Sequence, residues 1–422
     1  MRRAVLVVCD SLRRDLITPA TAPALAALAE TSADFINSRG VFPSVTRVTS
    51  ACIATGCRPA SHGLLGNTMV LDEGDGLVCL SVAKPEFRER MRRATGGTLR
   101  RATLAEHLAR TGGSIVMSNV SPGAAYFQDP DGHGWVYHRA GSFAPGLVPV
   151  PAGDQLVLEQ GNAGDATMTD RFCEDVLIRR RPPLAVLWLS EPDFTGHRTA
   201  LGSPAHRAAI AGADRCVERV RETLDVVGDG DDALLIVCSD HGMETTGRTI
   251  RLDQLLVDAG LKASVMSRDV VVAPNGTAAL ISRSRAARAT VEDLRRFLEA
   301  QDWVARVLTG AELAEQGLPT DEALAVAVTM RADDRPNEFG VRGFSDIVLD
   351  PEATLDYTGC GQHGGLGSNE QRPFLFVRGG GFAPGSRVNE GVSPIDIAPT
   401  VLRHLALPWT GVDGRPLPPR GP

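Results

Sequence analysis

The chain has 422 residues, 43% of them hydrophobic and 23% charged, so it can bury a large core organised as two or three structural units. Its formal net charge of −7 and pI near 5.8 argue against binding of extended nucleic acid, because a phosphate backbone requires a basic surface. No apolar run approaches the roughly 18 residues that cross a bilayer, so we expect a soluble protein.

The N-terminal segment is expected to be a buried strand and not a signal peptide. Residues 4–9 are apolar, but Asp10, Arg13 and Arg14 follow at once. The eight cysteines are scattered, without the close spacing of a zinc ribbon or a disulfide framework. We therefore expect reduced, mostly buried cysteines and a cytoplasmic protein.

Apolar runs that end in polar residues recur along the chain and predict the strands of a parallel sheet. They cover residues 4–9, 114–117, 185–189, 234–238 and 374–377. Continuous runs of this kind fit strands that are covered on both faces. Helical patterns that would supply the crossovers lie at 22–30, 104–111, 167–178 and 204–226. The predicted fold is an open, mostly parallel α/β sheet flanked by helices.

Between residues 246 and 343 the pattern changes, and we expect a smaller inserted α+β cap domain. Helical patterns and strand-like stretches alternate there, at 252–259, 270–273, 277–281, 291–300 and 324–330. The catalytic α/β core would then comprise residues 1–245 and 344–422.

Five segments carry a metal-binding side chain where a strand is expected to end. In an open α/β sheet, ligands bind beyond the carboxyl ends of the strands. The side chains are Asp10, Thr46, Asp193, His197, Asp240, His241 and His363. Two metal ions roughly 3.5–4 Å apart can stabilise both the attacking and the leaving oxygen of a phosphoryl displacement. Although each residue alone is weak evidence, the set favours a two-zinc phosphoryl-transfer hydrolase.

The order and setting of these residues resemble the alkaline phosphatase superfamily, in particular its nucleotide pyrophosphatase/phosphodiesterase and phosphonoacetate hydrolase branch. The similar motifs cover residues 10–67, 190–243 and 361–365. The resemblance implies two bound zinc ions, with manganese as an alternative. It assigns one ion to Asp10, Thr46, Asp240 and His241, and the other to Asp193, His197 and His363.

Thr46 is the predicted nucleophile. Residues 48–54 are typical of a short helix that ends at Gly56, which would put Thr46 at the N-terminus, where free amides favour a phosphate oxygen. Coordination by zinc would lower the pKa of its hydroxyl. A helix cap is the alternative role of Thr46.

Asn67 is the second predicted catalytic residue. It lies where the resembled phosphodiesterases place an amide that donates a hydrogen bond to a nonbridging phosphate oxygen. An ordinary turn asparagine is the alternative.

Two alternatives, a sulfatase and an inactive metal-binding relative, fit the sequence less well. The Cys57-Arg58-Pro59 segment suggests a sulfatase, but the fifth position of that motif is Ser61 and not arginine. In sulfatases the modified cysteine is expected nine residues before the threonine that here is Thr55. Thr46 occupies that position in this chain. An inactive metal-binding relative would lack the nucleophile or a ligand, and none is missing.

Arg47 and the segment 126–141 are the predicted substrate contacts. Arg47 replaces the aromatic residue that usually follows the nucleophile in nucleotide phosphodiesterases, and its guanidinium suits a phosphate or carboxylate. A surface arginine is the alternative. Residues 126–141 are expected to form a loop near the site mouth, in which Tyr126 and His133 are tentative contacts and Phe127 and Trp135 offer further stacking faces.

The predicted function is hydrolysis of a phosphate diester or a pyrophosphate-type small molecule through a phosphothreonine intermediate. The alternatives are a C–P bond hydrolase similar to phosphonoacetate hydrolases, a phosphomonoesterase and the inactive relative. We expect a small phosphorylated or phosphonate substrate, no nucleic acid polymer and no membrane partner, and a homodimer is considered for the assembly.

Overall fold

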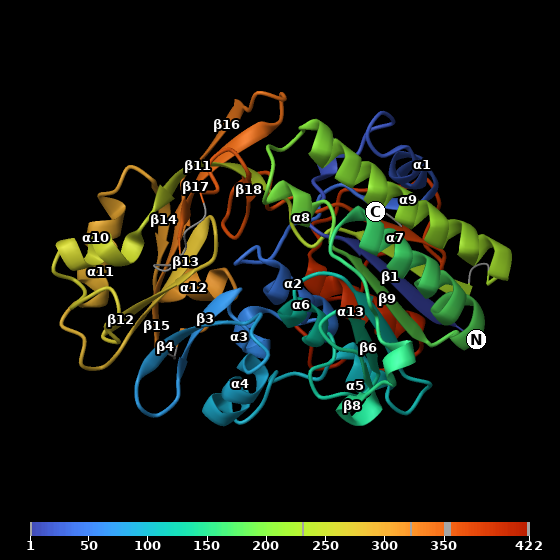
Figure 1. Ribbon diagram of the computed structural model, residues 1–422, viewed down its shortest axis with the longest axis horizontal. Coiled ribbons are helices and arrows are strands. Elements are labelled where there is room, and N and C mark those ends of the chain that lie inside the picture. The colour runs from blue at the N-terminus through green and yellow to red at the C-terminus, as the bar shows by residue number, and fades with distance from the viewer. Residues whose placement is uncertain (1, 230–231, 321–322, 350–355, 420–422) are drawn as a thin grey trace.

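The computed structural model describes residues 2–229, 232–320, 323–349 and 356–419, which form two lobes side by side (Figure 1). The larger lobe is built on a ten-stranded sheet. In spatial order, its strands are β20 (Arg387–Val388), β2 (Ala33–Phe35), β19 (Leu375–Arg378), β10 (Ala233–Cys238), β1 (Arg3–Cys9), β9 (Leu184–Leu189), β5 (Ser114–Ser118), β6 (Trp135–His138), β7 (Phe143–Ala144) and β8 (Val148–Pro149).

The centre of this sheet is parallel. Strand β1 lies between β10 and β9 and is parallel to both, and β5 continues the parallel order beyond β9. Strand β19 runs antiparallel to β10, and β7 runs antiparallel to β6. The predicted α/β fold with a mostly parallel sheet is confirmed. Because β1, β9 and β10 are parallel, their carboxyl ends lie at one edge of the sheet.

Helices cover both faces of the large sheet, and alternate residues of β1 enter two separate cores. Val5 and Val7 pack with helices on one face, whereas Leu6 and Val8 pack on the other. The first face carries α1 (Pro23–Thr31), α7 (Asn162–Arg171), the π-helix η4 (Phe172–Arg180) and α9 (Pro204–Val227). The second carries α2 (Thr46–Thr55), α5 (Leu104–Leu108), α6 (Pro122–Tyr126) and α13 (Ile397–His404). In the described ranges no helix combines the length and apolarity needed to span a bilayer.

The smaller lobe contains two four-stranded sheets. One consists of β12 (Val270–Pro274), β13 (Ala278–Arg283), β15 (Leu324–Met330) and β14 (Val304–Leu308), with α10 (Leu252–Asp258) and α11 (Val291–Glu299) packed on it. The other consists of β16 (Ala332–Pro336), β17 (Arg342–Val348), β11 (Glu244–Ile250) and β18 (Gly361–Gln362). This second sheet joins strands from inside and outside the predicted cap, so the boundary at 246–343 stays a prediction.

Shorter elements complete the two lobes. The hairpin of β3 (Thr68–Asp72) and β4 (Leu77–Ser81) contacts β12 of the smaller lobe. The remaining α-helices are α3 (Pro59–His62), α4 (Phe87–Thr95), α8 (Asp193–Gly196) and α12 (Ala311–Glu315).

The expectation of a single loop at residues 126–141 is wrong. Helix α6 ends at Tyr126, and residues 135–138 form β6, which is a parallel neighbour of β5. The reason is the register with β5, which pairs Val136 with Val116 and so satisfies backbone groups that a loop would leave to water.

Candidate active site

The seven predicted ligand and nucleophile residues come together at the carboxyl edge of the central sheet. Asp10 follows β1 directly, Asp240 comes two residues after β10, and Asp193 opens α8 after β9. His363 follows β18, and Thr46 is the first residue of α2. The parallel order of β1, β9 and β10 brings Asp10, Asp193 and Asp240 to one edge of the sheet, and β18 and α2 add His363 and Thr46 there.

His241 is the centre of a first group. Its Nε2 atom lies 3.0 Å from Asp240 Oδ2, 3.8 Å from Asp10 Oδ1 and 3.2 Å from Thr46 Oγ1. All four side chains are buried, and that of Asp240 is fully inaccessible. The Thr46 hydroxyl thus lies beside an imidazole nitrogen and close to two carboxylates.

Asp193 joins the first group to a second. Its Oδ1 atom lies 3.2 Å from His197 Nε2 and 3.5 Å from His363 Nε2, and the His363 ring stacks on His241 with 3.7 Å between centroids. Ligand atoms of Asp193, His197 and His363 all lie within 4.8 Å of one another, as do those of Asp10, Asp193 and His241. Asp193 therefore faces both groups, whereas the sequence resemblance assigns it to the second ion alone.

The three histidines are oriented as metal ligands are. In each of them, Nδ1 faces a backbone carbonyl oxygen. The pairs are His197 with Gly361 (3.0 Å), His363 with Ser44 (2.8 Å) and His241 with Gly242 (3.0 Å). An Nδ1–H that donates to a carbonyl leaves the Nε2 lone pair directed at the centre, and such outer contacts are typical of metal-bound imidazoles.

Two carboxylate oxygens also fit a cation. Asp10 Oδ1 and Asp240 Oδ2 are buried without a hydrogen-bond partner among the described residues. Burial, together with the negative charges of Asp240 and Asp193, raises the pKa of Asp10. Because an unpartnered buried carboxylate is costly, a bound cation would relieve both the repulsion and the lost hydration. The nitrogen and oxygen donors suit zinc or manganese.

Ser11 and Trp188 support the ligands, and no sequence pattern singled them out. The backbone of Ser11 is left-handed, with a φ of 62°, and its N–H donates to Asp240 Oδ1 at 3.0 Å. Its hydroxyl donates to Asp193 Oδ1 at 2.7 Å. Trp188 Nε1 donates to Asp10 Oδ2 at 3.1 Å. The one available signal for Ser11 was its place directly after Asp10.

A pocket of about 220 Å³ opens onto these groups. It is lined by Asp10, Thr46, Arg47, Asn67, Val120, Ser121, Gln160, Ser190, Asp193, Phe194, His197, Arg198 and His363. The backbone N–H of Arg47 donates to Asn67 Oδ1 at 3.2 Å, so the amide nitrogen of Asn67 remains available as a donor. Burial lowers the pKa of Arg47 to about 10. Because this value is still well above 7, the guanidinium is charged at neutral pH.

Tyr126 and His133, the other two tentative contacts, do not line this pocket. The Tyr126 hydroxyl donates to the carbonyl of Gly141 at 3.0 Å, and its ring packs edge-on against His138. The backbone N–H of His133 is held by Asp129 in the turn before β6. Because β6 belongs to the central sheet, Tyr126 and His133 make their contacts beside that sheet and not in the pocket.

Glu370 ties the loops of the site to the smaller lobe, and no sequence pattern pointed to it. Its Oε2 atom accepts hydrogen bonds from Gly364 N (2.6 Å), Gly365 N (2.8 Å), Ser44 Oγ (3.0 Å) and Thr277 Oγ1 (2.7 Å). The donors belong to the loop after His363, the loop before Thr46 and the turn before β13. One buried carboxylate therefore holds together the segments that carry a ligand and the nucleophile.

Glu370→Gln is expected to lower the free energy of unfolding by about 2–4 kcal/mol, because an amide group would face donors that now share a carboxylate. We also expect kcat to fall at least about tenfold, since His363 and Thr46 lose their common support. Denaturant unfolding and initial rates measure both effects. The matched control is Glu338→Gln, an exposed carboxylate of the smaller lobe, which should change neither. Unaltered stability of the Glu370 variant would contradict the structural role.

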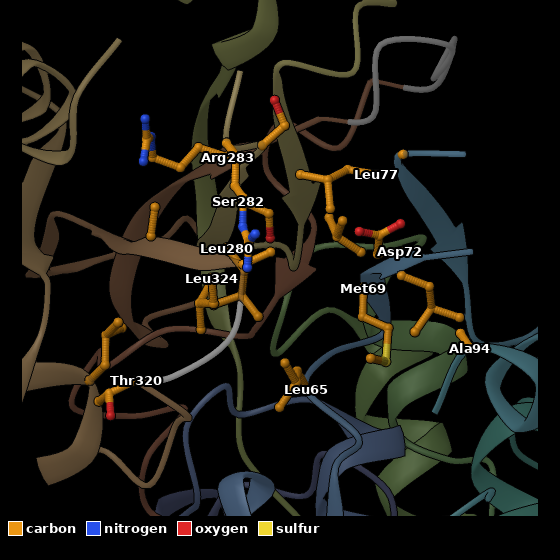
Figure 2. Close-up of a pocket in the computed structure, with 18 of the residues that line it drawn as sticks. Leu65, Met69, Asp72, Leu77, Ala94, Leu280, Ser282, Arg283, Thr320 and Leu324 are labelled. Atoms are coloured by element: carbon orange, nitrogen blue, oxygen red, sulfur yellow. The ribbon is translucent and has the colours of Figure 1, made fainter. Parts of the chain in front are cut away.

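A larger cavity, of about 1300 Å³, lies between the β3–β4 hairpin and strands β13 and β15 (Figure 2). Leu65, Met69, Leu77, Leu280 and Leu324 form much of its apolar wall. None of the seven ligand and nucleophile residues lines it. The smaller pocket, with its converging carboxylates and imidazoles, is therefore the candidate active site.

The chain matches a known protein family over most of its length. The family model of type I phosphodiesterases / nucleotide pyrophosphatases matches residues 4–373. Among individual proteins, human ectonucleotide pyrophosphatase/phosphodiesterase family member 7 is 40% identical over 65 residues, which span 15% of this chain and 14% of that protein. The matched range contains all seven ligand and nucleophile residues.

Solved structures share the architecture. Murine ectonucleotide pyrophosphatase/phosphodiesterase 5, as an inactive variant in complex with AMP, superposes with a TM-score of 0.70 at 17% identity, covering 98% of this chain and 97% of that chain. A second structure of the same murine protein gives a TM-score of 0.68 at 16% identity with the same coverage. At these identities the likeness shows a common fold.

Proposed function

Since the chain belongs to the type I phosphodiesterase / nucleotide pyrophosphatase family, we propose that it is a two-zinc hydrolase of a phosphate diester or pyrophosphate-type small molecule, acting through a phosphothreonine intermediate. The observation that carries this proposal is the position of the Thr46 hydroxyl. It lines the pocket and lies 3.2 Å from His241 Nε2, within a cluster of three carboxylates and three imidazoles. A hydroxyl in such a setting is suited to nucleophilic attack on phosphorus.

Two ions are assigned to two sets of side chains. Asp10, Thr46, Asp240 and His241 would hold one ion, and Asp193, His197 and His363 would hold the other, with Asp193 also within reach of the first ion. When bound, the ions supply Lewis-acid polarisation of phosphoryl oxygens and lower the pKa of a hydroxyl or water. The unpartnered oxygens of Asp10 and Asp240 support this assignment.

The protein's own groups would act in two steps. Thr46 Oγ1 attacks phosphorus, the bond from phosphorus to the leaving oxygen breaks, and the hydroxyl proton passes through solvent to the leaving group. Asn67 Nδ2 would donate to a nonbridging oxygen, and the engagement of its Oδ1 by the Arg47 N–H supports this role. Water then attacks the phosphothreonine, the bond from phosphorus to Oγ1 breaks, and Thr46 recovers its hydroxyl proton.

The test is a comparison of rates with the metal-loaded protein. The substrates are bis(p-nitrophenyl) phosphate, p-nitrophenyl phosphate, the p-nitrophenyl ester of thymidine 5′-monophosphate, and phosphonoacetate. We expect kcat/KM for the diesters to exceed that for the monoester at least tenfold. A dominant phosphonoacetate rate would assign the protein to the C–P hydrolase alternative. Absence of turnover on all four, with both ions bound, would indicate an inactive relative.

A further inference from the structure

Arg47 presents a positive charge to the pocket, and no described carboxylate forms an ion pair with it within 4.0 Å. It lies in the first turn of α2, directly after Thr46, and lines the pocket. Its Nε atom donates to Ser121 Oγ at 3.1 Å, and Nη1 donates to the carbonyl of Asn67 at 2.9 Å. Both acceptors are uncharged. In the described part of the chain, Nη2 makes no hydrogen bond and the guanidinium forms no ion pair within 4.0 Å.

The side chain of Arg47 is held in a fixed orientation. A Cβ atom on Gly123 would lie 3.0 Å from Arg47 Cδ and 2.6 Å from the carbonyl oxygen of Val82, so glycine leaves the room that the arginine stem occupies. Ser121 and Asn67 then fix two of the three guanidinium nitrogens. A donor that is ordered before the ligand arrives loses less entropy on binding.

A half-buried cation that has no direct ion pair in the described structure suits an anionic ligand. Removing a charge from water is costly unless it is paired, and guanidinium pairs well with phosphoryl and carboxylate oxygens. Among the described residues, the metal-site carboxylates form no ion pair with Arg47 within 4.0 Å, and the charges of Asp193 and Asp10 act on it only from a longer distance. The free Nη2 group of Arg47 is thus an unused pair of N–H donors next to the nucleophile.

The lining of the pocket includes a second cation, Arg198. The guanidinium carbon of Arg198 lies 3.8 Å from the ring centroid of Phe194, and Arg198 Nη1 donates to the Phe194 carbonyl at 2.6 Å. Arg198 is exposed, so its charge is more screened than that of the half-buried Arg47. The pocket volume of about 220 Å³ lies below the ~300–1,000 Å³ of drug-sized ligand sites, which favours a compact substituent.

We propose that Arg47 binds a second anionic group of the substrate, carried on a compact substituent one or two bonds beyond the reacting phosphorus. This inference rests on the proposed function and makes Arg47 its specificity-determining residue. The shared chemistry is a cluster of terminal anionic oxygens. A second phosphoryl group in a pyrophosphate-type compound and a carboxylate in a substituted phosphonate both supply it.

The test uses three ligands that carry the same phosphonate and differ only in the second group. Methylphosphonate has none, phosphonoacetate adds a carboxylate, and methylenediphosphonate adds a phosphoryl group. Dissociation constants measured by calorimetry on the metal-loaded protein should show at least a tenfold preference for one of the latter two over methylphosphonate. The preferred compound identifies the source of the second charge.

Arg47→Met is expected to reduce that preference to threefold or less, whereas Arg47→Lys should retain an intermediate preference. The ratio of constants is the readout, because general damage to the site would weaken all three ligands together. The control Arg306→Met removes an exposed charge of β14 and should keep the wild-type ratio, including any contribution from chelation. An unchanged ratio in Arg47→Met would overturn the inference. Calorimetry needs no turnover, so a failure of the proposed function would be seen separately.

Discussion

Replacing Thr46 by alanine should lower kcat on a phosphate diester at least about a thousandfold while both ions stay bound, because the variant lacks the attacking oxygen. The structure argues against a simple capping role. The N-cap of α2 is Val45, and no side chain makes a cap hydrogen bond there. The Thr46 hydroxyl instead lies beside His241, so its loss should leave the helix intact.

Two further variants sharpen this prediction. Thr46→Ser keeps an oxygen and should recover a measurable part of the rate. Thr49→Ala is the matched control, since it removes a neighbouring buried hydroxyl of α2 that lacks any partner in the described structure and does not line the pocket. Stopped-flow rates and metal analysis on the same samples decide the matter. A Thr46→Ala protein with two ions and the wild-type rate would eliminate threonine as the nucleophile.

The central sheet and the ligand positions follow from a short chain of sequence reasoning. The apolar runs at β1, β9 and β10 are continuous because both faces of these strands are buried, so they are recognisable without structural data. Once the strands are taken as parallel, the polar residues after them must meet at one edge. Asp10 and Asp240 could therefore be assigned to one site although they are far apart in the sequence. Ser11, which follows Asp10 and donates a hydrogen bond to Asp240, lies 229 positions before it.

The supporting residues could not be found in the same way. Glu370 contacts Ser44 across 326 positions and Thr277 across 93, and neither pair leaves a local pattern in the sequence. Strand β6 is short and mixes aromatic with polar residues, so its pairing with β5 is what defines it. Tertiary pairing thus overrides local composition, and side chains that act through other side chains have no spacing of their own.

Removal of the metal ions is expected to abolish hydrolysis and to lower the melting temperature by roughly 5 °C or more, because ligands that bind only the folded state stabilise it by mass action. Without cations, Asp10 Oδ1 and Asp240 Oδ2 keep no hydrogen-bond donor in the described structure. Dialysis against a chelator, followed by addition of zinc or manganese, tests whether both activity and melting temperature return. Full activity after exhaustive removal would contradict a metal-dependent reaction.

Asp193→Asn should have a larger effect on metal content than a substitution at any ligand of a single group. Its carboxylate lies beside His197 and His363, and a ligand atom of Asp193 is also within 4.8 Å of those of Asp10 and His241. Replacing this carboxylate by a neutral amide should therefore weaken metal binding by both groups. We expect fewer than one ion per chain and a rate at least about a thousandfold lower.

Glu191→Gln is the matched control for this substitution. Glu191 is a buried residue two positions away, and burial raises the pKa of its carboxyl to about 7. Among the described residues, this carboxyl accepts hydrogen bonds only from Thr195 N and Oγ1. An amide can keep both of these contacts, so metal content should remain at two. If Asp193→Asn also kept two ions, Asp193 would be a neighbour of the metal groups and not a ligand shared between them.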